Sequence, residues 1–133
     1  MSRLTWLEYG MELAKTTSLR SEDPYLQVGC CILRPDNSIA SLGYNGAPPG
    51  VNIDWSNRDD RRKRVIHAET NALRFIKPGE GDRMFVTLMP CSDCLKNAAS
   101  YGINKIFYNK VYNFDTSAKD LAQEFRITLQ QIT

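Results

Sequence analysis

Four residues of this chain have the types and spacing of a metal-assisted catalyst. His67, the only histidine in the sequence, stands two residues before Glu69, and Cys91 and Cys94 follow, three positions apart. Cysteines with this spacing lie on one side of a helical turn, so both thiols can face one point. Pro90, just before them, suits the first position of a helix. A helix N-terminus favours the thiolate, which is the form that binds metal.

The number of ligands separates the possible kinds of site. The cysteine pair alone is compatible with a redox disulfide, half of a structural zinc site or a catalytic metal centre. With His67 there are three protein ligands, whereas structural zinc sites close with four. The fourth position is left for water, whose pKa bound zinc lowers to about 7. Glu69 is then placed to move the proton of that water; the simpler interpretation is a first-turn acid stabilised by the helix dipole.

Length and composition limit the class of protein. A chain of 133 residues is the size of one ordinary domain, so we expect a single domain over 1–133. A net charge of +2 is too small for coating nucleic acid or an anionic membrane by charge alone. We find neither an apolar run of roughly 20 residues nor signal-peptide features. We therefore expect a cytoplasmic protein with no membrane or nucleic-acid partner.

Alternating helices and strands must position these residues. Hydrophobic periodicity predicts helices that open near Thr5 and span Ala68–Ile76, Cys91–Tyr101 and Ser117–Glu124. Short apolar runs predict strands over Val28–Leu33, Ser38–Leu42, Met84–Leu88, Ile103–Tyr108 and, at an edge, Phe125–Leu129. The segment Gly43–Gly50 is expected to be loop, and a polar stretch to Arg64 follows it. Interleaved helices and strands predict a three-layer α/β fold with a mixed sheet of about five strands, covered by helices on both faces.

The motifs resemble those of the zinc-dependent cytidine deaminase superfamily. H-x-E followed by P-C-x-x-C is the signature of zinc deaminases. A closer similarity to the deoxycytidylate (dCMP) deaminases rests on segments that run in order between Leu4 and Tyr112: Arg20–Pro24, Gln27–Gly29, Gly43–Pro48, His67–Leu73 and Thr87–Cys94. The resemblance implies the three-layer cytidine-deaminase-like fold. Cys30 and Cys31 stand where the family has small or apolar residues, and we expect them in the core on opposite faces of a strand.

The resemblance also implies an activity, the hydrolytic deamination of dCMP to dUMP and ammonia in pyrimidine deoxynucleotide metabolism. One catalytic zinc per chain would be held by His67, Cys91 and Cys94, and Glu69 would transfer the protons. The remaining implied contacts are the backbone N–H of Ala68 to the base carbonyl, the backbone carbonyl of Met89 to the amino group, and Asn45 to the sugar. A second, structural zinc is not expected, since no spare histidine is present.

A nucleotide substrate needs a cation for its phosphate, and Arg20 is our first candidate, with Arg3 second. Arg20 could instead be a solvated residue ending the first helix. Tyr112 and Tyr108 could close on the base or phosphate, or belong to the core. The run Arg58–Arg64 reads as a solvated face, with effector phosphates or a subunit contact as the alternative.

Regulation is the last implication of the resemblance. The loop Gly43, Tyr44, Asn45 and Gly46 corresponds to the family's effector site, where dCTP activates and dTTP inhibits, with Mg²⁺ on the phosphates and usually in a homo-oligomer such as a hexamer. Two other functions stay open: a deaminase acting on a base in tRNA or single-stranded DNA, and a non-catalytic zinc-binding regulatory module. Glu69 argues against the second, because a purely structural site has no use for it.

Overall fold

The computed structural model describes residues 2–112 and 115–133. Within these ranges the helices are α1 (Trp6–Ser18), α2 (Arg58–Arg64), α3 (Ala68–Leu73), α4 (Ser92–Ser100) and α5 (Ala118–Glu124). The strands are β1 (Gly29–Leu33), β2 (Ile39–Tyr44), β3 (Arg83–Leu88), β4 (Lys105–Lys110) and β5 (Thr128–Gln131). None of the helices described here is both long enough and apolar enough for a bilayer crossing.

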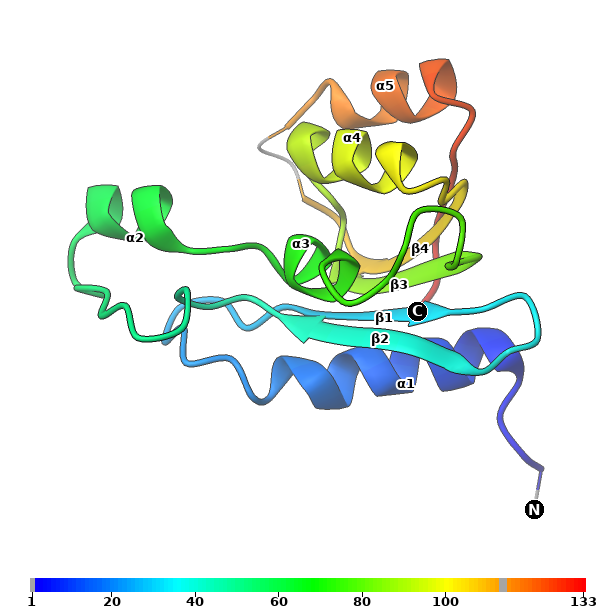
Figure 1. Ribbon diagram of the computed structural model, residues 1–133, viewed down its shortest axis with the longest axis horizontal. Coiled ribbons are helices and arrows are strands. Elements are labelled where there is room, and N and C mark those ends of the chain that lie inside the picture. The colour runs from blue at the N-terminus through cyan, green and yellow to red at the C-terminus, as the bar shows by residue number, and fades with distance from the viewer. Residues whose placement is uncertain (1, 113–114) are drawn as a thin grey trace.

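The five strands form one mixed sheet in the order β2-β1-β3-β4-β5. Strand β1 is antiparallel to both of its neighbours, while β3, β4 and β5 run parallel. Helix α1 covers one face of the sheet, and α3, α4 and α5 cover the other (Figure 1). The expected three-layer arrangement with a mixed sheet of five strands is confirmed.

Strand β1 is the centre of the core, and all five of its residues are buried. Cys30 packs with the residues under α3, α4 and α5, whereas Cys31 packs with Met11 and Ala14 of α1. Successive side chains of a strand point to opposite faces, and here both faces are covered. The expectation that the two cysteines belong to the core on opposite faces is confirmed.

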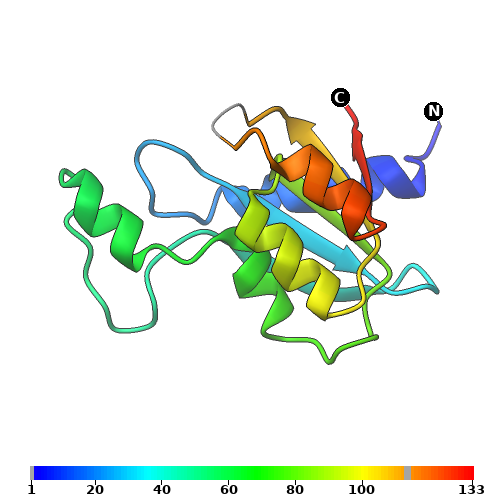
Figure 2. The ribbon, with the colours of Figure 1, turned by 90° about the horizontal axis from the view of Figure 1, so that it is seen from above.

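Two segments are more regular than the sequence indicated. Gly43 and Tyr44 end strand β2, where they pair with Cys30 and Gly29. The charged run Arg58–Arg64 forms helix α2, which has no buried residue and projects from the body of the domain (Figure 2). Its sequence explains the helix: the Asn57 side chain caps it, acidic residues occupy the first turn and basic residues the last, as the helix dipole favours.

Other element boundaries differ from the prediction by a few residues. Helix α3 ends at Leu73, three residues earlier than expected. Strands β4 and β5 begin later than expected because the preceding helices end in similar turns. The N–H of Ile103 donates to the Ala98 carbonyl at 3.1 Å, and the N–H of Ile127 to the Ala122 carbonyl at 2.8 Å. These N–H groups close helix ends, so pairing in the sheet begins only after them.

Candidate metal centre and active site

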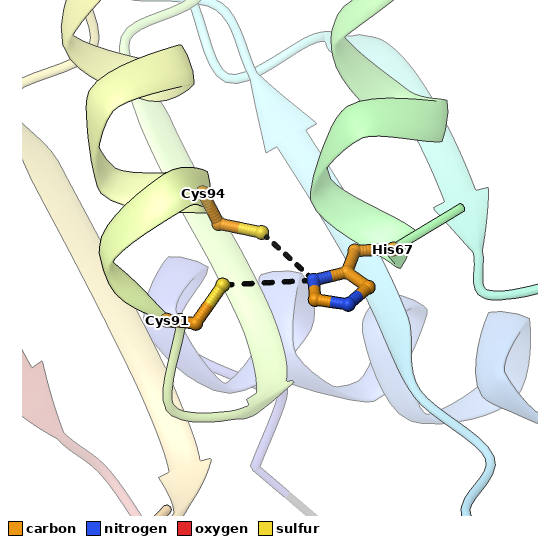
Figure 3. A group of neighbouring side chains, drawn as sticks. All are labelled: His67, Cys91 and Cys94. Carbon is orange, nitrogen blue, oxygen red and sulfur yellow. Dashed lines mark hydrogen bonds between the residues drawn. The ribbon is translucent and has the colours of Figure 1, made fainter. Parts of the chain in front are cut away.

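The three candidate ligands come from two helix N-termini on the same face of the sheet. His67 is the N-cap residue of α3 and Cys91 that of α4, so Pro90 lies before the helix and not at its first position. Cys94 follows one turn into α4. Figure 3 shows the three side chains pointing toward one another. The centre lies just beyond the carboxyl end of β3, the end at which ligands bind in open α/β sheets.

The distances between the donor atoms fit a tetrahedral zinc ion. Nδ1 of His67 lies 3.3 Å from Sγ of Cys94 and 3.6 Å from Sγ of Cys91. All three donor atoms lie within 4.8 Å of one another. With Zn–S of about 2.3 Å and Zn–N of about 2.0–2.1 Å, a tetrahedral ion would separate N and S by about 3.6 Å. One nitrogen and two sulfur donors are also a set that zinc prefers.

The surroundings of Cys91 favour the thiolate form that binds metal. Hydrogen bonds from Cys94 and His67 lower the pKa of the Cys91 thiol to about 4, against the desolvation that burial imposes. The same contact raises the pKa of Cys94, because its proton bridges to the Cys91 sulfur. The hydrogen bond to Cys91 raises the pKa of His67. Of the three donors, Cys91 thus has the surroundings that most favour the metal-binding form, and a bound metal would displace the protons of the other two.

Glu69 is the second residue of α3, and it is 4% exposed. Burial raises the pKa of its carboxyl group, and this effect exceeds the opposing hydrogen bond from its own backbone. It lines a cavity of about 210 Å³ together with His67 and Cys91. A carboxyl group with a raised pKa beside a metal position can both accept and return a proton.

Most of the predicted substrate contacts meet in this cavity. Its walls include Asn45, Ala68, Met89 and Tyr112, with Val28 and Leu88 as apolar surfaces. The N–H of Ala68 is the first of α3 and so has no acceptor within the helix. Tyr108 is not among the lining residues; it is 5% exposed and packs in the core. Arg20 is also not among them.

Asn45 cross-links the segment that precedes β1. Its Oδ1 accepts the N–H of Val28 at 2.9 Å, and its Nδ2 donates to the Leu26 carbonyl at 2.9 Å. The Ser21 hydroxyl donates to the Asn45 carbonyl at 2.9 Å. Asn45 therefore shapes the cavity wall, and only part of its hydrogen-bonding capacity remains for a sugar hydroxyl.

Two arginines and an aspartate that the sequence analysis did not assign to the substrate also line the cavity: Arg61, Arg62 and Asp23. The Arg61 guanidinium lies 4.3 Å from the centre of the Tyr25 ring and donates to the Trp55 carbonyl at 2.6 Å. These contacts hold α2 at the cavity rim. The signal in the sequence was the basic run that ends three residues before His67. Composition alone could not show that two of its arginines line the cavity.

Arg20 lines a second hollow of about 640 Å³ at the edge strand β2. Gly43, Tyr44 and Gly46 line it as well, together with Arg74 at the end of α3. Three of the four residues of the predicted effector loop thus face this hollow, whereas Asn45 faces the cavity at the metal centre.

Gly43 has a clear packing role. A Cβ at this position would lie 2.4 Å from the backbone nitrogen of Ala72 and 2.6 Å from the backbone oxygen of Ala68. Helix α3 can therefore approach β2 only where the strand has no side chain. The Ser41 hydroxyl adds a hydrogen bond of 2.7 Å to the Ala72 carbonyl. This close packing fixes the helix that carries Glu69.

Comparison with known proteins identifies the family. The family described as "Cytidine and deoxycytidylate deaminase zinc-binding region" matches residues 4–110. The chain belongs to this family. A deoxycytidylate deaminase from Mus musculus is 33% identical over 144 residues, covering 98% of this chain and 81% of the mouse protein. A probable deoxycytidylate deaminase from Caenorhabditis elegans is 35% identical over 132 residues, covering 92% of this chain and 67% of its own length.

A solved structure of this family is similar over nearly the whole chain. The dCMP deaminase of cyanophage S-TIM5, in complex with dCMP and dUMP, superposes with a TM-score of 0.82 at 26% identity, covering 99% of this chain and all of the phage chain. The cytidine-deaminase-like fold is thereby confirmed. The family's zinc-binding character agrees with the donor geometry at His67, Cys91 and Cys94.

Proposed function

We propose that this protein catalyses the hydrolytic deamination of dCMP to dUMP and ammonia in pyrimidine deoxynucleotide metabolism. The observation that carries the proposal is the buried carboxyl group of Glu69 beside a three-donor metal centre, in a cavity bordered by two arginines. The similarity to deoxycytidylate deaminases, including one studied with dCMP and dUMP, supports the choice of substrate.

The polar groups nearest the metal position have distinct roles in this reaction. Zinc held by His67, Cys91 and Cys94 would lower the pKa of water and so supply a nucleophile at neutral pH. The Glu69 carboxylate would carry one proton of that water to N3 of the cytosine ring as the water oxygen bonds to C4. It would then pass the second proton, from the new C4 hydroxyl group, to the amino nitrogen, so that the C4–N bond breaks and ammonia leaves. The remaining contacts are those of the Ala68 N–H with the base carbonyl and of the Met89 carbonyl with the amino group. Water and dCMP thus give dUMP and ammonia.

The substrate monophosphate is assigned to the rim of the cavity at Arg61 and Arg62. Arg61 is engaged by the Trp55 carbonyl and the Tyr25 ring, whereas Arg62 is exposed and has the freer side chain. Asn45 and Tyr112 would bound the sugar between the rim and the metal centre. Arg20, our first candidate from the sequence, lines the second hollow and fits an effector phosphate better than the substrate phosphate.

The second hollow is proposed as a triphosphate effector site, with dCTP as activator and dTTP as inhibitor. Arg20 and Arg74 provide two cations there for phosphates, which Mg²⁺ would accompany. The hollow and the catalytic cavity share one short segment, because Tyr44 and Gly46 line the hollow while Asn45 between them lines the cavity. An effector that binds one position of this segment more tightly than another would change the affinity of the cavity for its substrate.

One assay tests the activity and another its regulation. Ammonia release is measured from dCMP, deoxycytidine and a cytosine-containing oligonucleotide at equal concentrations; fastest release from dCMP is expected, and release from the oligonucleotide alone would overturn the assignment. We further expect a homo-oligomer on sizing and sigmoidal dependence on dCMP, relieved by dCTP and deepened by dTTP. Hyperbolic kinetics unaffected by either triphosphate would refute the proposed effector site but not the proposed deaminase activity.

A further inference from the structure

Asp115 joins the N-termini of two helices beside the metal centre. Its Oδ2 accepts the backbone N–H of Ser92 at 2.7 Å and the Ser92 hydroxyl at 2.7 Å. Its Oδ1 accepts the backbone N–H of Ser117 at 3.2 Å and the Ser117 hydroxyl at 2.8 Å. The two hydroxyls also lie 2.8 Å apart. A single carboxylate thus ties the first residue of α4 to the N-cap residue of α5.

Asp115 supplies a side-chain acceptor at the N-terminus of α4, where the N-cap residue is itself a candidate metal ligand. The N-cap side chain usually accepts an N–H from the first turn, but the Cys91 side chain makes no such hydrogen bond. Its sulfur is directed at Nδ1 of His67 instead. The N–H of Ser92, which has no acceptor within the helix, is satisfied by a carboxylate 23 positions away. The negative charge also suits the positive end of the helix dipole.

We propose that Asp115 is a positioning residue of the metal centre: through Ser92 it holds the turn at Cys91 so that the two sulfur atoms keep their spacing to His67. It touches neither the ligand atoms nor the cavity, and it acts by limiting the motion of the backbone that carries Cys91. Residues that orient metal ligands in this way commonly change metal affinity about 10- to 100-fold when they are removed. The proposal rests on the zinc centre and not on the identity of the substrate.

The test measures zinc release from the holoenzyme to a coloured chelator. Asp115→Ala is expected to release zinc at least about tenfold faster than the parent protein. Asp115→Asn is expected to fall between them, because the amide oxygen can still accept the Ser92 N–H but carries no charge. Asp120→Asn removes the same charge from the exposed first turn of α5, away from Ser92, and is expected to release zinc at the parent rate.

A stability control separates positioning from a general loss of stability. Arg34→Ala removes hydrogen bonds to Glu80 and Ile39 at the opposite end of the sheet. It is expected to lower the unfolding midpoint without accelerating zinc release. Cobalt-substituted protein adds a spectroscopic measure, since the thiolate-to-cobalt absorption should shift in Asp115→Ala and not in Arg34→Ala. Zinc release from Asp115→Ala at the parent rate, or no faster than from Arg34→Ala, would overturn the proposal.

Discussion

His67 and Cys91 hold the same position in two different helices, since each is the N-cap residue and neither side chain makes a capping hydrogen bond. Their donor atoms lie 3.6 Å apart. The two helix N-termini therefore converge on the metal position, and their first N–H groups take different roles. Ala68 lines the catalytic cavity and its N–H has no acceptor within the helix, whereas the N–H of Ser92 donates to Asp115.

Zinc content depends on the three ligands and on no other cysteine. The purified protein should hold one zinc per chain, and replacement of His67, Cys91 or Cys94 by Ala should remove it, because two donors bind zinc far more weakly than three. Cys30→Ala is the control, since Cys30 is a buried core residue of β1. Elemental analysis of the dialysed proteins gives the result; full zinc occupancy in Cys91→Ala would refute the ligand assignment.

Glu69→Gln should separate proton transfer from metal binding. The amide keeps the size of the side chain but cannot carry the proton, so the rate should fall on the order of 10²–10⁴-fold while zinc is retained. Asp93→Asn serves as the control, because Asp93 is an exposed acid in the first turn of α4 that pairs with Lys96. Ammonia release and zinc content are measured together. Near-normal turnover in Glu69→Gln would make Glu69 only a helix-terminal acid.

Arg62→Ala should reduce the preference for dCMP over deoxycytidine. A hydrogen bond to a charged group contributes about 1.5–3 kcal/mol, less when exposed, so the ratio of the two kcat/KM values should fall about three- to tenfold. Arg58→Ala in the same helix, which does not line the cavity, should leave the ratio unchanged. Arg20→Ala should also leave it unchanged while weakening the response to dCTP. A smaller ratio in Arg20→Ala alone would return the substrate phosphate to Arg20.

Gly43→Ala should destabilise the fold, whereas Gly46→Ala should not. The new Cβ in Gly43→Ala would meet backbone atoms of α3 at 2.4 Å and 2.6 Å, and backbone cannot rotate out of the way. We expect a loss of about 1–3 kcal/mol in the free energy of unfolding, together with lower activity. At Gly46 the nearest atom would be Oε1 of Glu22 at 3.8 Å. Urea unfolding measures both, and equal stabilities would mean that α3 can shift at no cost.

Asp115 should contribute stability that is lost in acid. Its hydrogen bonds from Ser92 and Ser117 lower the pKa of its carboxyl group from 3.8 to about 2. A lowered pKa in the folded state means that the contribution is complete above about pH 4 and disappears as the pH falls toward 2. The difference in unfolding free energy between metal-free parent and Asp115→Ala should therefore be constant above about pH 5 and shrink below pH 4. A difference that does not change over this range would contradict the charged hydrogen bonds.

The prediction of the fold was most accurate where the evidence is local. The helix that opens near Thr5 follows from hydrophobic periodicity, and the structure adds a capping box at Thr5 whose two hydrogen bonds measure 2.8 Å and 3.1 Å. The buried strand β1 follows from a short apolar run. Boundaries were less accurate at β4 and β5, because the N–H groups of Ile103 and Ile127 are used to close the preceding helices.

The sequence by itself determined the chemistry of the centre: a lone His67 before Glu69, and two cysteines at the spacing of one helical turn. These relationships are local, so they hold in any fold that forms the two helices. Only the tertiary structure decided that Arg61 and Arg62, not Arg20, border the cavity, and that Asp115 caps Ser92 from 23 positions away. Such pairings depend on where α1 and α2 lie relative to the sheet and on where Asp115 lies relative to α4, which residue spacing does not encode.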